Sequence, residues 1–139
     1  MNEPQLTEAD KHRIESAFAG VPFIRFMGIE LLGLEHGRAI LRIGARDELK
    51  RNGDVIHGGV TASLIDTAAA FAIMTLLAPG ESTTTVDLTV HYLRPLVTGQ
   101  ATAHARIVRD GRRIVIAAVD VFDDAETLVA TSLATYVRV

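Results

Sequence analysis

The chain of 139 residues contains no cysteine. This absence excludes a disulfide framework, a catalytic thiol and any metal site built from thiolates, and it fits a reducing compartment. A strong charge of either sign is also lacking, because 14 basic and 17 acidic residues leave a formal net charge of −3. Such a chain shows none of the basic excess typical of nucleic-acid binding. We therefore expect a cytoplasmic protein that binds no nucleic acid.

Long apolar segments are equally scarce. The amino terminus is polar and mixed in charge, without the apolar h-region of a signal peptide. The one long apolar run, residues 60–77, contains Asp66, hydroxyl residues and many alanines, which argues against a membrane span. No repeat or low-complexity linker divides the sequence. We expect residues 1–139 to form one domain, opened by a helical segment within residues 1–20.

Periodicity and turn residues predict two helices and six strands. Thr7 is placed to cap a helix that runs to Phe18, with Asp10 three residues on in capping-box style. A second, more apolar helix is expected at residues 58–78, and residues 22–27 are expected to be a short connector. The expected strands are residues 29–34, 38–43, 82–93, 100–108, 113–122 and 128–139.

The helix expected at residues 58–78 is apolar on nearly every side, so most of its surface must be covered. A curved antiparallel sheet wrapped around it would do this, and the alanines from Ala62 to Ala72 would let the sheet come close. The same small residues are also compatible with a helix–helix contact. We favour the wrapped helix, an α+β fold, because six strands leave no other large element to bury it. Tight turns between the last three strands predict an antiparallel meander.

Asp66 is the only charged residue in the apolar run, and the tripeptide His57-Gly58-Gly59 begins nine positions before it. Desolvation on so apolar a helix disfavours the charged form of a carboxylate. Fully buried, unpaired carboxylates are rare, so we favour a chemical task such as general base or nucleophile. The structural alternative is a buried Asp that caps a neighbouring loop.

Four short segments carry a resemblance: His57-Gly58-Gly59, residues 63–68, Val86-Asp87-Leu88 and residues 92–95. In this combination, the chain from residue 22 to residue 139 resembles the PaaI-type hotdog thioesterases, which hydrolyse acyl-coenzyme A. The resemblance implies a hotdog fold, in which a long central helix is wrapped by a six-stranded antiparallel sheet. It also implies a homodimer, often doubled to a dimer of dimers. In that family each active site lies at the dimer interface and takes the acid from one subunit and the H-G-G segment from the other.

The resemblance implies roles for four residues. Asp66 would activate water or attack the thioester carbon itself, and the sequence leaves both routes open. The backbone N–H of Gly58, at the N-terminus of the helix, would polarise the thioester carbonyl. Gly59 would let the acyl group approach the backbone, although both glycines have the alternative of serving only the turn. His57 would hold the leaving thiolate, or would orient the loop as a structural hydrogen-bonding residue.

Two further positions follow from the family pattern. Thr85 stands where relatives place a Ser or Thr that orients the water, and its alternative is an ordinary strand threonine. Relatives carry an Asn six residues before the His, where this chain has Arg51, and its own asparagine comes one place later as Asn52. We expect Asn52 to reach the site across a shortened loop. If the Asn role is lost instead, activity is weak or directed to another acyl group.

Coenzyme A carries phosphates, so basic residues are expected around the mouth of the site. The candidates on strand ends and turns are Arg94, Arg112, Arg113 and Lys50. Charged turn residues are also commonly just solvated. The usual acyl groups of the family are aromatic or medium-chain. No cofactor is expected, and a metal trio of His57, His91 and Asp66 matches no standard ligand spacing.

Other activities hosted by the same fold remain as alternatives. A hydratase or dehydratase would carry a His followed by a Phe-Pro-Gly spacing, which is absent. A non-catalytic acyl-CoA or small-molecule binding module would use the same pocket without cleavage. We expect a homodimer, paired into a tetramer, built through residues 82–93, which are β-rich and carry only Asp87 as a charge.

Overall fold

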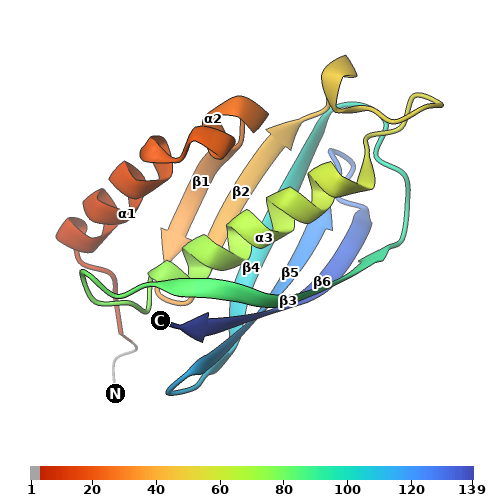
Figure 1. The fold of residues 1–139 in the computed structure, drawn as a ribbon. Helices are drawn as coiled ribbons and strands as arrows, with labels where there is room; N and C mark the ends of the chain where they lie inside the picture. Colours follow the sequence, from red (N-terminus) through yellow and green to blue (C-terminus); the bar gives the residue numbers. More distant parts are fainter. Residues whose placement is uncertain (1–3) are drawn as a thin grey trace.

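The computed structural model describes residues 4–139, which form three α-helices and one six-stranded sheet (Figure 1). The helices are α1 (Glu8–Gly20), α2 (Pro22–Met27) and α3 (Gly58–Met74), with a short 3-10 helix at Asp47–Leu49. The strands are β1 (Glu30–Glu35), β2 (Arg38–Gly44), β3 (Thr83–Tyr92), β4 (Gln100–Asp110), β5 (Ile114–Phe122) and β6 (Leu128–Arg138).

All neighbouring strands run antiparallel, in the order β1-β2-β4-β5-β6-β3. α3 lies across one face of the curved sheet, and α1 and α2 lie beside β1 (Figure 1). The predicted α+β class, with a long helix wrapped by a six-stranded antiparallel sheet, is confirmed. The meander of β4, β5 and β6 is confirmed as well.

The core lies between α3 and the sheet, and α3 packs mainly against β2, β4 and β5. Both surfaces are built from small side chains. Ala68, Ala69 and Ala72 on α3 are fully buried, and the inward-facing Ala101 and Ala103 of β4 expose no more than 1% of their surface. The alanines of α3 therefore serve chiefly a close helix–sheet contact. The larger buried residues of α3 fill the space around this seam, and each contributes about 1.5–3 kcal/mol by leaving water. They are Val60, Leu64, Ile65, Phe71 and Ile73.

Most predicted elements are present with ends shifted by no more than two residues. Thr7 caps α1 as predicted, because its Oγ1 accepts the Asp10 N–H at 3.0 Å. α3 ends at Met74 rather than at the predicted Ala78. The cause is Thr75, whose hydroxyl donates back to a helix carbonyl and accepts an N–H from the β1–β2 turn. This contact with the turn ends the helix before the proline is reached.

Residues 22–27 form a short helix, so the prediction of a connector there was wrong. A proline occupies the first position, where its missing N–H is no loss, and Gly28 ends the helix in the left-handed conformation. Arg46 holds this end, since its guanidinium donates to the carbonyl oxygens of Met27 at 2.7 Å and Phe26 at 3.1 Å. The helix is therefore fixed by a residue that is distant in the sequence.

β3 lies at one edge of the sheet, bonded to β6 along one side and unpaired along the other within residues 4–139. A bulge between Thr85 and Asp87 shifts its register. The strand is joined to α3 at both ends, because Thr85 donates to Asp66 and the Tyr92 hydroxyl donates to the Gly58 carbonyl. A ten-residue edge with free N–H and C=O groups is a surface to which another strand can add.

Candidate active site

Asp66 lies in the middle of α3, partly buried, and lines a cavity of about 290 Å³. The cavity has two kinds of wall. Phe23 and Ile24 of α2, together with Phe71 of α3, make one side apolar. Residues 83–85 at the start of β3 line it with hydroxyl groups on the other side. The carboxylate thus faces a space that accepts both apolar and polar groups.

The Asp66 carboxylate is held through one of its two oxygens. Oδ1 accepts from the Thr85 hydroxyl at 3.0 Å and lies 2.5 Å from the Tyr136 hydroxyl. Within the described part of the chain, no hydrogen bond reaches Oδ2. The partners of Asp66 are strand hydroxyls rather than loop amides, so the alternative of a loop cap does not describe it. One oxygen is anchored, and the other is left for chemistry.

Tyr136 exposes 3% of its surface and also lies 2.7 Å from the Asp66 carbonyl oxygen. Burial, and then the hydrogen bond to Asp66, raises the pKa of Tyr136 far above its ordinary value. The phenol therefore stays protonated and acts as a donor. Hydrogen bonds to a carboxylate are worth roughly 1.5–3 kcal/mol, so this pair fixes the orientation of the acid.

His57 and Gly58 form the N-terminus of α3, 8 to 9 residues before Asp66. His57 is the N-cap, because its ring Nδ1 accepts the Gly59 N–H at 2.8 Å. The backbone N–H of His57 donates to the Leu49 carbonyl at 2.8 Å. Because Nδ1 is an acceptor, the proton of the neutral ring lies on Nε2. Gly58 takes the first helical position, whose N–H has no acceptor within a helix and lies at the positive end of the dipole.

Space rather than backbone conformation favours glycine at both positions, because neither has a positive φ. A Cβ on Gly58 would lie 3.3 Å from the Tyr92 ring, whose hydroxyl donates to the Gly58 carbonyl at 2.7 Å. A Cβ on Gly59 would lie 3.0 Å from Nδ1 of His57. The alternative that the glycines serve only the turn is therefore incomplete. Their lack of a side chain also leaves space at the start of the helix, next to Tyr92 and His57.

Gly58 lines a second cavity, of about 320 Å³. Arg94, one of the candidate phosphate-binding residues, lines this cavity, and so does Arg51. The cavity shares no lining residue with the one at Asp66. Eight residues of helix separate Gly58 from Asp66, which is roughly 12 Å along the axis. One chain therefore carries two half-sites, a Gly58 half-site and an Asp66 half-site, that do not meet on one carbonyl group.

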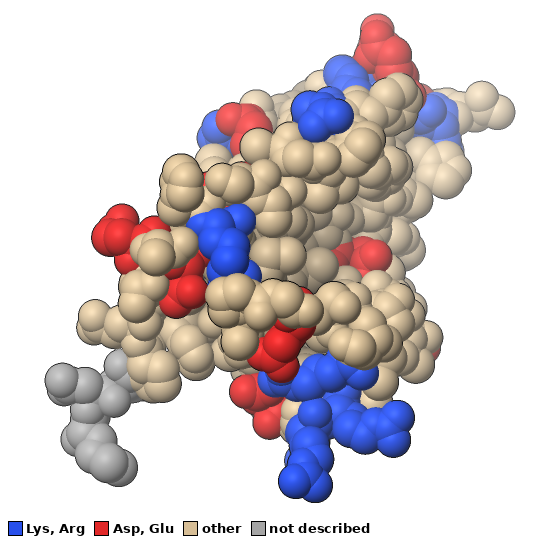
Figure 2. Space-filling view, turned by 60° about the vertical axis from the view of Figure 1, so that its left-hand side comes forward, with Lys and Arg blue, Asp and Glu red and all other residues tan. Residues whose placement is uncertain are grey.

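The other predicted residues lie apart from both half-sites. Asn52 is exposed in the turn of residues 51–54 and lines neither cavity. Lys50 is paired with two carboxylates, at 3.1 Å from Asp47 and 3.0 Å from Asp54. The turn between β4 and β5, which carries Arg112 and Arg113, lies at the end of the sheet away from Gly58 (Figure 1). Basic side chains gather at this lower end in the space-filling view (Figure 2).

No group of three possible metal ligands occurs among residues 4–139. His91 pairs with Thr131 across β3 and β6, whereas Tyr92, its neighbour, reaches α3. Successive residues of a strand point to opposite faces, so His91 faces away from His57 and Asp66. Among the same residues, no helix is both long and apolar enough to cross a membrane.

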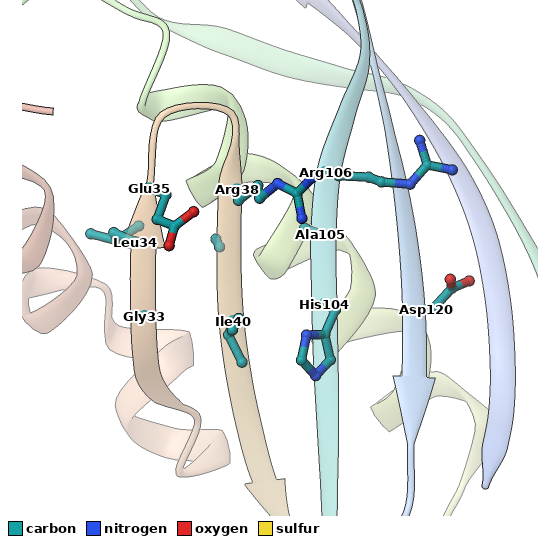
Figure 3. Close-up of a pocket in the computed structure, with 10 residues that line it drawn as sticks. Gly33, Leu34, Glu35, Arg38, Ile40, His104, Ala105, Arg106 and Asp120 are labelled. Carbon is teal, nitrogen blue, oxygen red and sulfur yellow. The ribbon is translucent and has the colours of Figure 1, made fainter. Parts of the chain in front are cut away.

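A third cavity, of about 290 Å³, lies on the face of the sheet opposite to α3 (Figure 3). Arg38 of β2 and Arg106 of β4 are cross-strand neighbours there, and both side chains extend in the direction of β5, with His104 and Asp120 lining the same cavity. It contains none of the residues His57, Gly58 and Asp66. We therefore place the candidate active site on the α3 side.

Tyr136 and Tyr92 contact the half-sites, and sequence reasoning gave neither of them a role. Both sit at inward positions of alternating strands, where a hydroxyl needs a partner on the helix. The alternation of apolar and polar residues along β6 could have shown that Tyr136 faces inward. It could not have shown that its partner is Asp66, 70 residues earlier.

A long helix laid across a six-stranded antiparallel sheet in this strand order is the hotdog fold. The chain belongs to the Thioesterase superfamily, whose family model matches residues 53–130, more than half of its length. The resemblance to the PaaI-type hotdog thioesterases is confirmed by this match and by the solved structures that share the fold. The protein is a thioester hydrolase.

Among its relatives is the medium/long-chain acyl-CoA thioesterase YigI of Escherichia coli K12, 30% identical over 131 residues that cover 84% of each chain. The PaaI protein of the phenylacetic acid degradation operon of E. coli has the same fold, with a TM-score of 0.89 at 21% identity over 96% of each chain. The thioesterase HI1161 of Haemophilus influenzae aligns with a TM-score of 0.84 at 22% identity, over 92% of this chain and 89% of its own.

Proposed function

We propose that the protein is an acyl-CoA thioesterase whose active site forms between two copies of the chain. The observation that carries the proposal is the Asp66 carboxylate, anchored through Oδ1 by two hydroxyls and free at Oδ2 beside a cavity. A free carboxylate oxygen in a partly desolvated cavity suits a general base or a nucleophile. The missing oxyanion donor is supplied by Gly58 of the partner subunit.

The free edge of β3 offers a geometry for this assembly. Thr85 is tied to Asp66 at one end of the strand, and Tyr92 is tied to Gly58 at the other. If two β3 strands pair antiparallel about a two-fold axis between Leu88 and Thr89, Thr85 lies opposite Tyr92 of the partner subunit. Each Asp66 half-site then adjoins a Gly58 half-site of the other chain, giving two sites per dimer. Pairing of two such dimers gives the proposed tetramer.

The chemistry proceeds by one of two routes that share their binding groups. In the first, Asp66 Oδ2 takes a proton from water as the water oxygen attacks the thioester carbon. In the second, Oδ2 attacks the carbon and forms a mixed anhydride, which water then hydrolyses. In both, the carbonyl oxygen gains negative charge and accepts from the Gly58 N–H, a contact worth about 3 kcal/mol. In the first route the C–S bond breaks when the tetrahedral intermediate collapses, and in the second it breaks as the anhydride forms. The thiolate takes up a proton in both routes, and the products are a carboxylate and the thiol of coenzyme A.

His57 and the basic residues are proposed to serve the coenzyme side. The Nε2 proton of His57 faces no partner along the loop and is available to the leaving thiolate, while Gly59 leaves room for the thioester. Arg94 binds a phosphate at the Gly58 cavity. The β4–β5 turn lies beside the Thr83 end of β3 through Arg138. Antiparallel pairing brings that turn, with Arg112 and Arg113, to the Gly58 half-site of the other chain.

The acyl group is proposed to be aromatic or medium-chain, because one wall of the Asp66 cavity is apolar. The names of two relatives agree with this range, since one is a medium/long-chain acyl-CoA thioesterase and another comes from the phenylacetic acid degradation operon. Thr85 and Asn52 keep their proposed roles. Thr85 acts through its bond to Asp66, and Asn52 reaches the site only if the turn of residues 51–54 moves or the partner approaches it.

The proposal is tested by measuring thiol release from a panel of acyl-CoAs. Wild-type protein is expected to turn over at least one apolar acyl-CoA, and Asp66→Ala is expected to lose roughly a hundredfold or more in kcat. The matched control is Asp120→Ala, which removes a carboxylate from the outer face of the sheet and leaves activity unchanged. Full activity in Asp66→Ala contradicts the proposal. Thermal stabilisation by acyl-CoA without any cleavage identifies a binding module instead.

A further inference from the structure

The short helix α2 leaves two phenylalanines in contact with water. Phe23 is 49% exposed and Phe26 is 76% exposed. Only Phe23 lines the Asp66 cavity. Two large apolar side chains on one six-residue helix keep their hydrocarbon surface in water unless something covers it. The two residues share a helix and differ in their relation to the acid, which makes them a matched pair.

The residues that line the two cavities indicate how an acyl-CoA would be oriented between them. Arg94 lies at the Gly58 half-site, where the phosphates of coenzyme A would be held. The Asp66 half-site has hydroxyls on the β3 side and apolar side chains on the α2 side. A thioester whose carbon lies at Asp66 and whose coenzyme points toward Arg94 of the partner subunit therefore sends its acyl group toward α2.

We infer that Phe23 sets the preference of the enzyme for acyl-chain length, because its ring contacts the part of the chain that extends beyond Asp66. This inference rests on the proposed function, because it concerns the acyl half of the same site. Ile24 and Phe71 line the cavity too, but they are already 97% and 96% covered by the protein. Phe23 has the most apolar surface left to bury when an acyl chain arrives.

α2 is a fixed wall rather than a loose segment. Arg46 holds the carbonyl groups at its C-terminal end, and the buried Ile24 and Met27 anchor it to the core. The phenyl ring of Phe23 is therefore presented on a rigid element. Each methylene that leaves water against such a surface strengthens binding by about fourfold.

The test compares acetyl-, butanoyl-, hexanoyl- and octanoyl-CoA in wild type, Phe23→Ala and Phe26→Ala. In wild type we expect kcat/KM to rise with chain length. In Phe23→Ala the rise flattens, with roughly a tenfold loss on octanoyl-CoA and little loss on acetyl-CoA. Phe26→Ala keeps the wild-type slope. Phe23→Leu is expected to restore part of the slope, which a purely structural role for the ring would not predict.

Binding is measured in parallel so that the inference does not depend on turnover. Calorimetry on an Asp66→Ala background, with and without Phe23→Ala, gives the affinity for each intact acyl-CoA. Affinity that grows with chain length and depends on Phe23 supports the inference even if no variant hydrolyses a thioester, which would defeat only the proposed reaction. An unchanged slope in Phe23→Ala, or an equal flattening in Phe26→Ala, overturns it. If Phe23→Ala changes the oligomeric state but leaves the dependence on chain length unchanged, Phe23 belongs to a subunit contact, and the inference is overturned too.

Discussion

The start of α3 and its middle offer a substrate opposite things. At Gly58 the helix presents a backbone N–H on a residue without a side chain, beside a cavity that Arg94 also lines. At Asp66 it presents a carboxylate held by two hydroxyls beside an apolar wall. The first region suits developing negative charge and phosphates, and the second supplies negative charge and accepts hydrocarbon. The two regions lie roughly 12 Å apart along one helix, so within one chain they do not meet on one carbonyl group, and the proposed site between two chains rests on that separation.

The largest expected effect comes from removing the backbone donor. Gly58→Pro is tolerated at the first helical position but has no N–H, so kcat should fall roughly a hundredfold to a thousandfold. Gly58→Ala is the control, because it brings the same Cβ toward Tyr92 and keeps the N–H. Steady-state kinetics of both variants separate the lost hydrogen bond from the steric change. Equal losses in the two variants would mean that Gly58 matters only for space.

The same variant tests whether the two half-sites belong to different chains. Subunit exchange between inactive Asp66→Ala and inactive Gly58→Pro should restore one intact site in each heterodimer, about a quarter of the wild-type sites in an equal mixture. Exchange is confirmed by mass spectrometry of differently tagged chains. Confirmed exchange without recovered activity places the site within one chain, and a monomer by light scattering at micromolar concentration refutes the assembly.

A smaller effect is expected from removing either of the hydrogen bonds that hold the Asp66 carboxylate. Tyr136→Phe and Thr85→Val each remove a donor to Asp66 Oδ1, and each should lower kcat roughly tenfold while KM stays near its wild-type value. Thr131→Val removes a matching hydroxyl–carboxylate bond, to Asp120 on the outer face, and should change neither constant. A rise in KM without a fall in kcat would show that the two hydroxyls bind substrate instead of orienting the acid.

At the other half-site, Arg94→Gln should raise KM for an acyl-CoA severalfold and leave KM for the corresponding acyl-pantetheine unchanged, because the shorter thioester lacks the nucleotide phosphates. The effect should shrink at high salt, where exposed charge pairs are screened. Arg38→Gln, on the outer face of the sheet, is the control. An equal rise for both substrates would assign Arg94 a role in shaping the cavity.

The smallest expected effect concerns alkaline stability. Because burial raises the pKa of Tyr136, the phenol ionises at higher pH in the folded chain than in the unfolded one, where it titrates near about 10. Its contribution to the free energy of unfolding is therefore complete below about pH 10 and declines above it, by at most about 1.4 kcal/mol per pH unit. Urea unfolding at pH 8, 10 and 11 should show a shallower decline in Tyr136→Phe. An identical decline would show that this phenol does not titrate differently on folding.

The fold was largely predictable because its elements follow local patterns. Alternation marks the strands, and the unbroken apolar run of α3 requires a cover on most sides. The errors arose where distant residues decide. α2 depends on Arg46, nineteen to twenty positions later, and α3 ends where Thr75 meets Gly37 of another turn. No window of sequence around either helix contains those partners.

For the candidate site, the sequence proposed residues whose catalytic and binding roles stay predictions, and it gave little of the geometry. The spacing of His57, Gly58 and Asp66 pointed to the chemistry, and Thr85 does lie on the acid. Tyr136 was missed because its contact with Asp66 spans 70 residues and joins β6 to α3. Asn52 stays a prediction, since its turn is exposed and lies at neither half-site in one chain.

The alanine seam between α3 and the sheet also bears on how such a protein can evolve. Ala68, Ala69 and Ala72 are fully buried, so a single added methyl group would push the helix, and Asp66 with it, away from Thr85 and Tyr136. Mutations at the seam are therefore expected to be purged whatever the substrate. The exposed face of α2, which carries Phe23, and the exposed turns carry no such constraint. Lineages that change their acyl preference should keep the seam and record their divergence at positions such as Phe23.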